Sequence, residues 1–264
     1  MILAIDVGNT HITFGCLNEK NQAQPVVRIP TDLKETEFGY AVKMKEILEL
    51  SGVDENEFDG AIISSVVPPI TEMMKRAVGL ITDLEPLVVG PGLKSGIKIE
   101  LDDPGTLAAD LIATAVAAKY EYPLPCVIID MGTATTITVV SAAGSYIGGA
   151  ILPGVGTSLN ALTKGTSLLP SIEIQPPRKA ISKQTADAMK SGLIYGNAGS
   201  IDGILDQFEK EIGKPATIVS TGGLGRVVCP YCRHEISYDP QLLLKGLGII
   251  WKKNSKIQKR RSEN

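Results

Sequence analysis

The chain has 264 residues, of which 44% are hydrophobic and 21% charged, and its mean hydropathy is +0.13. This composition is typical of an ordinary soluble protein that can bury a substantial core in one large domain or in two intimate ones. The net charge of −3 and the pI near 5.6 argue against a nucleic-acid-binding surface over the whole protein.

The sequence also lacks the marks of a membrane or a disulfide-stabilised protein. No apolar stretch reaches the roughly 18 residues that a membrane-spanning helix needs, and the chain starts at once with a predicted strand. We therefore expect a cytoplasmic protein with no membrane partner. Four cysteines in a chain this long do not make a disulfide scaffold, so reduced thiols are expected at Cys16, Cys126, Cys229 and Cys232.

The first predicted element is a hairpin whose first strand ends in a carboxylate. Residues 3–7 and 12–16 are apolar, β-rich runs joined by a short polar turn. Asp6 can hold a hydrated cation, Gly8 lets backbone N–H groups approach phosphate oxygens, and Thr10 adds a hydroxyl donor. One such pattern is weak evidence for a phosphate loop, because a tight turn between two strands explains it equally well.

Strands and helices alternate through the rest of the first half. We expect a strand at 26–29, a helix at 35–51, a parallel strand at 60–66, a helix at 70–81 and a buried strand at 87–89. A further helix from Leu107 to Tyr120 is rich in alanine and apolar on most sides, so we expect it to be buried between two halves.

Asp110 lies near the start of this apolar helix. Burying a carboxylate there without a reason is costly, and phosphoryl transfer needs a base or orienting carboxylate for the acceptor hydroxyl. Asp110 is therefore the best candidate for the catalytic base. The alternative is that its charge favours the helix dipole or caps a neighbouring backbone group.

The hairpin pattern then repeats 124 positions later. The apolar run at 127–131 contains Asp130, and 136–140 is the second β-rich run. Gly132 and Thr133 lie between the two runs, as in the first hairpin. This duplication favours a pair of phosphate and metal clamps over two coincidental turns. Two such loops facing each other would hold one nucleotide. The chain contains neither a P-loop nor a dinucleotide-binding fingerprint.

The second half continues with a predicted glycine-rich turn at 146–154, a helix at 186–208, a strand at 217–220 and a final helix at 240–251. The glycines of 221–225 fit a loop on the nucleoside side, although an ordinary strand-to-helix turn fits equally well.

These elements predict an α/β protein with a duplicated, actin-like (ribonuclease H-like) fold. Two mixed β-sheet halves flanked by helices would enclose a nucleotide cleft. The expected division is an N-terminal half at 1–120, a C-terminal half at 121–254 and a disordered basic tail at 255–264.

Six motifs along the chain occur in the order of one known family. They are Asp6-Val7-Gly8-Asn9-Thr10, Ser64-Ser65-Val66-Val67-Pro68, residues 103–110, Asp130-Met131-Gly132-Thr133-Ala134-Thr135, residues 148–154, and Asp239-Pro240 before Leu244-Lys245-Gly246-Leu247. On these motifs residues 1–254 resemble the type III pantothenate kinases. The resemblance implies ATP-dependent phosphorylation of pantothenate to 4′-phosphopantothenate, the first step of coenzyme A biosynthesis. It also implies a homodimer, Mg²⁺ with ATP, and potassium or ammonium.

The same resemblance assigns roles residue by residue. The ATP-binding residues would be Asp6, Val7, Gly8, Asn9, Thr10, His11, Ile12, Thr13 and Thr133. Asp6 would hold the divalent ion and Asp130 the monovalent cation. Asp110 would be the base, and pantothenate would contact Ala108, Ala109, Asp110, Leu111 and Thr185.

One departure bears on activity. The family pattern Gly-Ala-Asp-Arg reads Ala108-Ala109-Asp110-Leu111 here, and leucine cannot replace the five donors of a guanidinium. The alternatives are therefore a catalytically impaired or regulatory paralogue that keeps ATP or pantothenate binding, a kinase for a related hydroxyl acceptor, or an actin-like structural protein.

Cys229, Cys232 and His234 have the spacing of half a zinc site. A zinc site needs four ligands, and the other histidine, His11, lies in the first predicted phosphate loop.

Overall fold

The computed structural model describes residues 1–262, with side chains described through residue 255. The chain forms two compact units. Unit 1 comprises Met1–Ile97, Asp102–Tyr120 and Gln241–Asn264, and unit 2 comprises Lys98–Leu101 and Glu121–Pro240. The units are therefore not the two continuous halves that we expected, since a C-terminal segment belongs to unit 1 and a short internal segment to unit 2.

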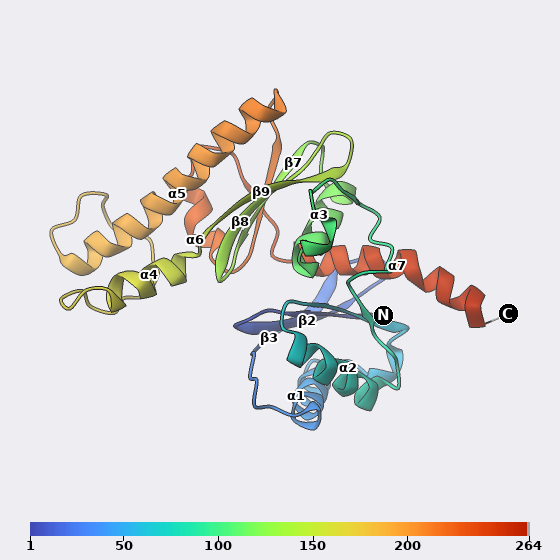
Figure 1. Cartoon of the computed structure of the whole chain (residues 1–264). Helices are drawn as coiled ribbons and strands as arrows, with labels where there is room; N and C mark the ends of the chain where they lie inside the picture. Colours follow the sequence, from blue (N-terminus) through green and yellow to red (C-terminus); the bar gives the residue numbers. More distant parts are fainter. Residues whose placement is uncertain (263–264) are drawn as a thin grey trace. The chain divides into compact units, whose positions relative to one another are not determined.

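Unit 1 contains a five-stranded mixed sheet in the order β3-β2-β1-β4-β5 (Figure 1). Its strands are β1 (Ile2–Val7), β2 (His11–Leu17), β3 (Ala23–Pro30), β4 (Gly60–Ser65) and β5 (Leu87–Val88). The pairs β1–β2 and β2–β3 are antiparallel, whereas β4 pairs in parallel with both β1 and β5. The predicted hairpin and the predicted parallel strand are confirmed.

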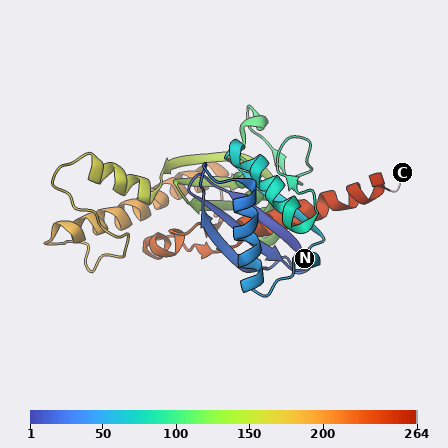
Figure 2. The same ribbon diagram turned by 90° about the horizontal axis from the view of Figure 1, so that it is seen from below.

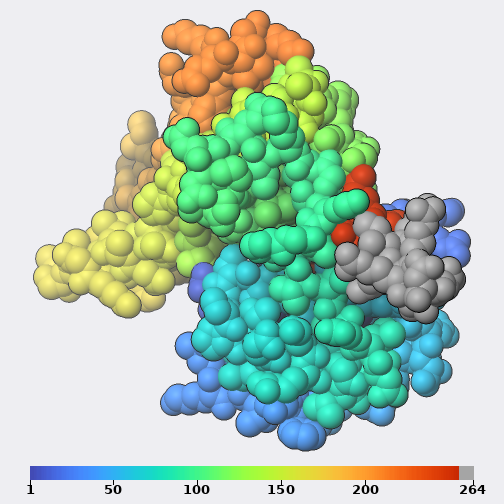
Figure 3. Space-filling view, turned by 45° about the vertical axis from the view of Figure 1, so that its right-hand side comes forward, coloured from blue at the N-terminus to red at the C-terminus, as the bar shows by residue number. Residues whose placement is uncertain are grey.

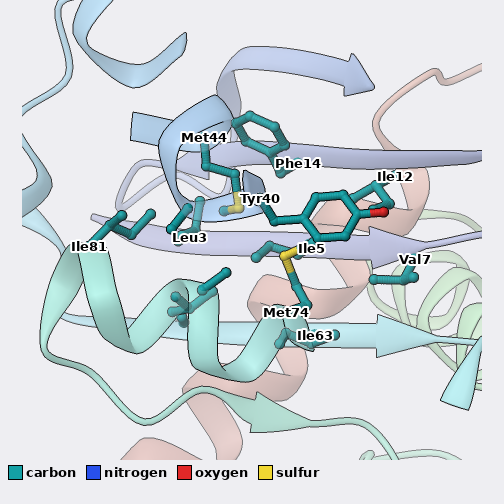
Figure 4. Packing of buried hydrophobic residues seen from close by; sticks show 14 of the residues in the cluster. Leu3, Ile5, Val7, Ile12, Phe14, Tyr40, Met44, Ile63, Met74 and Ile81 are labelled. Carbon is teal, nitrogen blue, oxygen red and sulfur yellow. The ribbon is translucent and has the colours of Figure 1, made fainter. Parts of the chain in front are cut away.

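Two helices cover one face of this sheet, α1 (Glu37–Leu50) and α2 (Pro68–Thr82) (Figure 2). The Thr36 side chain caps α1 by accepting from the N–H of Gly39 at 3.1 Å. Short 3₁₀ turns occur at Glu55–Glu57 and Pro104–Thr106. Alternate residues of each strand point toward α1 and α2, and Figure 4 shows them packed with Tyr40, Met44 and Met74: Leu3, Ile5, Val7, Ile12, Phe14 and Ile63.

The opposite face of the unit 1 sheet packs against α7 (Leu242–Ser262), which contacts β1, β2 and β4. A side chain of α7 also meets the sheet, because the Trp251 ring lies against Gly60. The helix α3 (Ala109–Glu121) in turn lies against α7, where Gly246 meets the backbone of Ala113. The last helix of the chain therefore completes the first unit.

The helix α7 is described through Ser262, residues 263–264 lie outside the described residues, and the disorder expected at 255–264 stays a prediction. Lysine, arginine and glutamine have high helix propensity, and neither glycine nor proline interrupts the sequence after Gly248.

Unit 2 repeats the strand arrangement of unit 1. Its six-stranded sheet has the order β11-β10-β7-β8-β9-β6. The strands are β6 (Lys98–Ile99), β7 (Cys126–Met131), β8 (Ala134–Val140), β9 (Ser145–Pro153), β10 (Thr217–Thr221) and β11 (Ser237–Tyr238). As in unit 1, an antiparallel three-stranded meander is followed by a strand parallel to its first member. The predicted duplication and the two mixed sheets are confirmed.

The glycine-rich segment at 146–154 is a strand, not the turn that we expected. A Cβ at Gly149 would lie 2.1 Å from the carbonyl oxygen of Ile137 on β8. Gly149 therefore permits the close approach of β8 and β9, and glycine in a strand can mark such an approach as well as a turn.

The helices of unit 2 are α4 (Val155–Lys164), α5 (Thr185–Ile212) and α6 (Gly225–Val228), followed by a 3₁₀ turn at Cys229–Tyr231. The long α5 confirms the helix predicted at 186–208. The sequence did not indicate α4, since its threonine, serine and asparagine residues have low helix propensity. Figure 3 shows the yellow segment around α4 at the surface. Among residues 1–262, no helix is both long and apolar enough to cross a membrane.

The contact between α3 and α7 makes a testable prediction. A Cβ at Gly246 would lie 1.8 Å from the carbonyl oxygen of Ala113, so Gly246→Ala forces two helix backbones apart. We expect a loss of about 1–3 kcal/mol in the free energy of unfolding, measured in urea. Gly203→Ala is the control, because nothing lies within 4 Å of its new methyl group on α5. It should stabilise by about 0.5–1 kcal/mol, and equal effects of the two substitutions would contradict the prediction.

Candidate active site

The β1–β2 turn of unit 1 is held in place by its own backbone and by Thr31. The N–H of Gly8 donates to the carbonyl oxygen of His11 at 3.0 Å, which closes the turn. The Thr31 hydroxyl donates to the carbonyl oxygen of Gly8 at 2.7 Å, and the Thr31 N–H donates to that of Thr10 at 3.0 Å. Asn9, Thr10 and His11 are exposed. The turn is thus a fixed loop with polar, accessible residues at its tip.

Strand alternation divides the predicted ATP-binding residues into two sets. The side chains of Val7 and Ile12 are buried in the core beneath α1 and α2, so only their backbone can meet a ligand. Asp6 is partly buried on the opposite face, paired with Thr13 on β2 and with Ser64 on β4. A carboxylate flanked by hydroxyl groups is an oxygen-rich set that suits Mg²⁺, which often binds one or two carboxylates together with substrate phosphates.

Unit 2 forms the same loop from different residues. The N–H of Gly132 donates to the carbonyl oxygen of Ala134 at 3.0 Å, and Asp130 pairs with Thr136 as Asp6 pairs with Thr13. Thr133 is exposed. From α4, the Thr157 hydroxyl fixes the loop by donating to the carbonyl oxygen of Thr133 at 2.7 Å. The helix α4, which the sequence did not indicate, therefore holds the predicted β7–β8 loop in place.

The glycine-rich loop after β10 lies against the end of β7. Gly222 has a φ of +82°, and a Cβ there would lie 2.8 Å from Oδ1 of Asp130. The Tyr238 hydroxyl donates to the carbonyl oxygen of Gly222 at 3.2 Å. Gly222 therefore allows the loop to contact the end of β7 in the same unit, beside Asp130, the predicted ligand of the monovalent cation.

Asp110 lies in the first turn of α3, in unit 1. Its Oδ1 accepts from the N–H of Leu111 at 2.8 Å, and the Thr114 hydroxyl donates to its carbonyl oxygen at 3.1 Å. Burial raises the pKa of the Asp110 carboxyl group, and the backbone hydrogen bonds from Leu111 and Asp110 itself oppose that rise. A carboxylate with a raised pKa is a stronger proton acceptor than an exposed one.

The residues adjacent to Asp110 in the sequence carry no side-chain hydrogen-bond donor. Ala108, Ala109 and Leu111 are partly buried. The Leu111 side chain occupies the position where the family pattern has a guanidinium. The desolvation of Asp110 is therefore not offset by a cation at that position.

Thr185 begins α5 and lines a hollow of about 630 Å³ within unit 2. Leu152, Leu162 and Met189 supply apolar lining, and Ser158 and Asn197 add polar groups. A mostly apolar hollow with a few polar groups has the size and character of a small-molecule site. Ser158 and Asn197 were not predicted, because no motif marks them and α4 was not expected.

The cysteine and histidine segment does not form the half zinc site that its spacing suggested. Cys229 Sγ donates to the hydroxyl oxygen of Ser220 at 3.2 Å. Nδ1 of His234 lies 2.7 Å from Oδ1 of Asp202 on α5. Within residues 1–262 no three histidine, cysteine, aspartate or glutamate side chains are grouped to hold a metal ion. These side chains instead attach the segment to β10 and α5.

Solved structures show that other proteins share this duplicated, actin-like fold. The activator of 2-hydroxyisocaproyl-CoA dehydratase from Clostridium difficile, with bound ADPNP, is similar with a TM-score of 0.53 at 12% identity, over 98% of this chain and 97% of that one. A conserved Campylobacter jejuni protein named for the Baf family of transcriptional activators has a TM-score of 0.62 at 20% identity, over 96% and 99% of the two chains.

Sequence comparison is more specific. Residues 2–207 match the model of the type III pantothenate kinase family. The chain is also 38% identical over 254 residues to the type III pantothenate kinase of Bifidobacterium adolescentis, covering 96% of this chain and 99% of that protein. The chain therefore belongs to the type III pantothenate kinase family and is a kinase.

The raised pKa of Asp110 predicts how its replacement changes stability with pH. Folding disfavours the charged carboxylate, so Asp110→Asn should raise the free energy of unfolding at about pH 7. Below the ordinary aspartate pKa of about 3.9 the carboxyl group is neutral in both states, and the difference should vanish.

Urea unfolding at about pH 7 and about pH 3 measures this difference. Asp102→Asn, at an exposed position of the same segment, is the control and should change little at either pH. A destabilised Asp110→Asn protein at neutral pH would show that the carboxylate is structural.

Proposed function

We propose that this chain transfers the γ-phosphoryl group of ATP to pantothenate, giving 4′-phosphopantothenate in the first step of coenzyme A biosynthesis. Membership of the family supports this reaction. The observation that carries it is the duplicated turn, because β1–β2 and β7–β8 each place an aspartate two residues before a glycine that closes the turn.

Each loop has a separate part in the proposal. Residues 6–13 form the proposed phosphate loop, in which backbone N–H groups at the exposed tip of the turn and the Thr10 hydroxyl bind the ATP phosphates. Thr133 is a further proposed ATP contact. Asp6 holds the divalent ion, which neutralises phosphate charge when bound. Asp130, beside the Gly222 loop, holds potassium or ammonium.

Asp110 is the base in this proposal. Its carboxylate accepts the proton of the pantothenate hydroxyl as the phosphoryl group is transferred. The hydrogen bond from the Leu111 N–H fixes one carboxylate oxygen, so the other can face the acceptor. The hollow beside Thr185 is the proposed contact for pantothenate in unit 2. The proposal includes a homodimer and a cytoplasmic location.

Leu111 supports a second candidate function. Without the guanidinium, an anionic acceptor loses a charged hydrogen-bond partner, which costs about 2–5 kcal/mol at buried positions. The chain would then be an ATP-binding paralogue with impaired turnover, or a kinase for a related hydroxyl compound.

A coupled ADP-release assay distinguishes these functions. Wild-type protein with MgATP, potassium and pantothenate should release ADP and form 4′-phosphopantothenate, identified by mass spectrometry. Asp110→Asn should form no product while remaining folded, and replacing potassium by sodium should lower the rate. A folded, ATP-binding wild type that forms no product would exclude the pantothenate kinase function.

The missing guanidinium predicts a gain of function. Leu111→Arg places five donors beside Asp110 and should raise kcat/KM for pantothenate by at least about tenfold, equal to 1.4 kcal/mol. Leu111→Met preserves volume without adding a donor and should leave kcat/KM nearly unchanged. Equal values for the two variants would mean that no guanidinium is needed at this position.

A further inference from the structure

Two adjacent serines at the end of β4 differ in their hydrogen bonding. Ser65 Oγ accepts from the N–H of Val67 at 3.1 Å and from the Thr71 hydroxyl at 2.7 Å, so it supports the start of α2. Ser64 Oγ is fully buried and has no hydrogen-bond partner. Leaving a buried hydroxyl unpaired costs about 1–3 kcal/mol, which alanine at this position would avoid. The hydroxyl of Ser64 therefore needs an explanation other than stability of this state.

The position of Ser64 gives that explanation. It pairs in parallel register with Asp6 on the neighbouring strand. Because Ile5, Val7 and Ile63 point toward α1 and α2, the intervening Asp6 and Ser64 share the other face of the sheet (Figure 4). Neighbouring strands lie about 4.8 Å apart, so two short side chains on one face can reach each other.

The same pairing of an aspartate with a hydroxyl residue on the parallel strand occurs in unit 2. There Asp130 is paired with Thr221 on β10, as Asp6 is with Ser64, and Thr221 is also buried. Each loop aspartate therefore has a buried hydroxyl residue beside it on the parallel strand. Ser64 follows a pattern of the duplicated fold.

We propose that Ser64 is a positioning residue for Asp6, and that its hydroxyl donates a hydrogen bond to the Asp6 carboxylate when that carboxylate holds the divalent ion. This inference rests on the proposed function of Asp6. Carboxylates that bind metal ions are themselves hydrogen-bonded, which fixes their orientation. A rotamer change of two short side chains is enough to form the bond.

Three variants test the inference through ion binding and stability. Mn²⁺ affinity is measured by electron paramagnetic resonance with a non-hydrolysable ATP analogue, and thermal unfolding is measured without nucleotide. Ser64→Ala should lower Mn²⁺ affinity about tenfold, while its unfolding temperature stays equal to wild type or rises. Ser64→Thr keeps the hydroxyl, as Thr221 does in unit 2, and should restore the affinity.

Ser65→Ala is the matched control. It removes two hydrogen bonds at the start of α2, so it should lower the unfolding temperature and leave Mn²⁺ affinity unchanged. Ser64→Ala should also raise the Mg²⁺ concentration for half-maximal rate without changing the KM for pantothenate.

The possible failures can be told apart. Wild-type Mn²⁺ affinity in Ser64→Ala, or a loss of stability as large as that of Ser65→Ala, overturns the positioning role. If the wild type itself binds no Mn²⁺ with the analogue, the proposed role of Asp6 fails first and the inference fails with it.

Discussion

Strand alternation in β1 and β7 is the constraint on which the rest of the structure depends. In β1 the residues on either side of Asp6 are buried beneath α1 and α2, so the carboxylate must lie on the other face. The same holds for Asp130 between Ile129 and Met131. A shift of one residue in strand register would bury both carboxylates in apolar cores. The packing that stabilises each sheet therefore also decides where its acidic group can act.

Much of the fold could be predicted because its strands are continuous apolar runs with clear ends. The two hairpins, the parallel strands that follow them and the long α5 required no knowledge of tertiary packing. The segment at 146–154 could not be predicted correctly, because glycine marks both turns and close strand contacts, and only the position of β8 decides between them. The place of α7 in unit 1 depends on contacts with strands more than 170 residues earlier in the chain.

The two loops of the candidate site could be located from the sequence, whereas the roles assigned to their residues stay predictions and the contacts that support the loops were not foreseen. The aspartates and glycines of both loops were recognised because they occur twice. Thr31 and Thr157 were not, although each fixes a loop through a backbone carbonyl oxygen. Such supporting contacts come from residues distant in sequence and have no local pattern. The hydrogen bond from Leu111 to Asp110 likewise uses a backbone group, which any residue at that position provides.

The place of α7 also has a consequence for synthesis. Apart from four residues, unit 2 is one continuous segment, whereas unit 1 is completed by a helix that follows unit 2 in the chain. Domains fold as units while the ribosome extends the chain from its N-terminus. Unit 2 can therefore fold while one face of the nascent unit 1 sheet is still uncovered, so that face is open to chaperones or aggregation until α7 emerges.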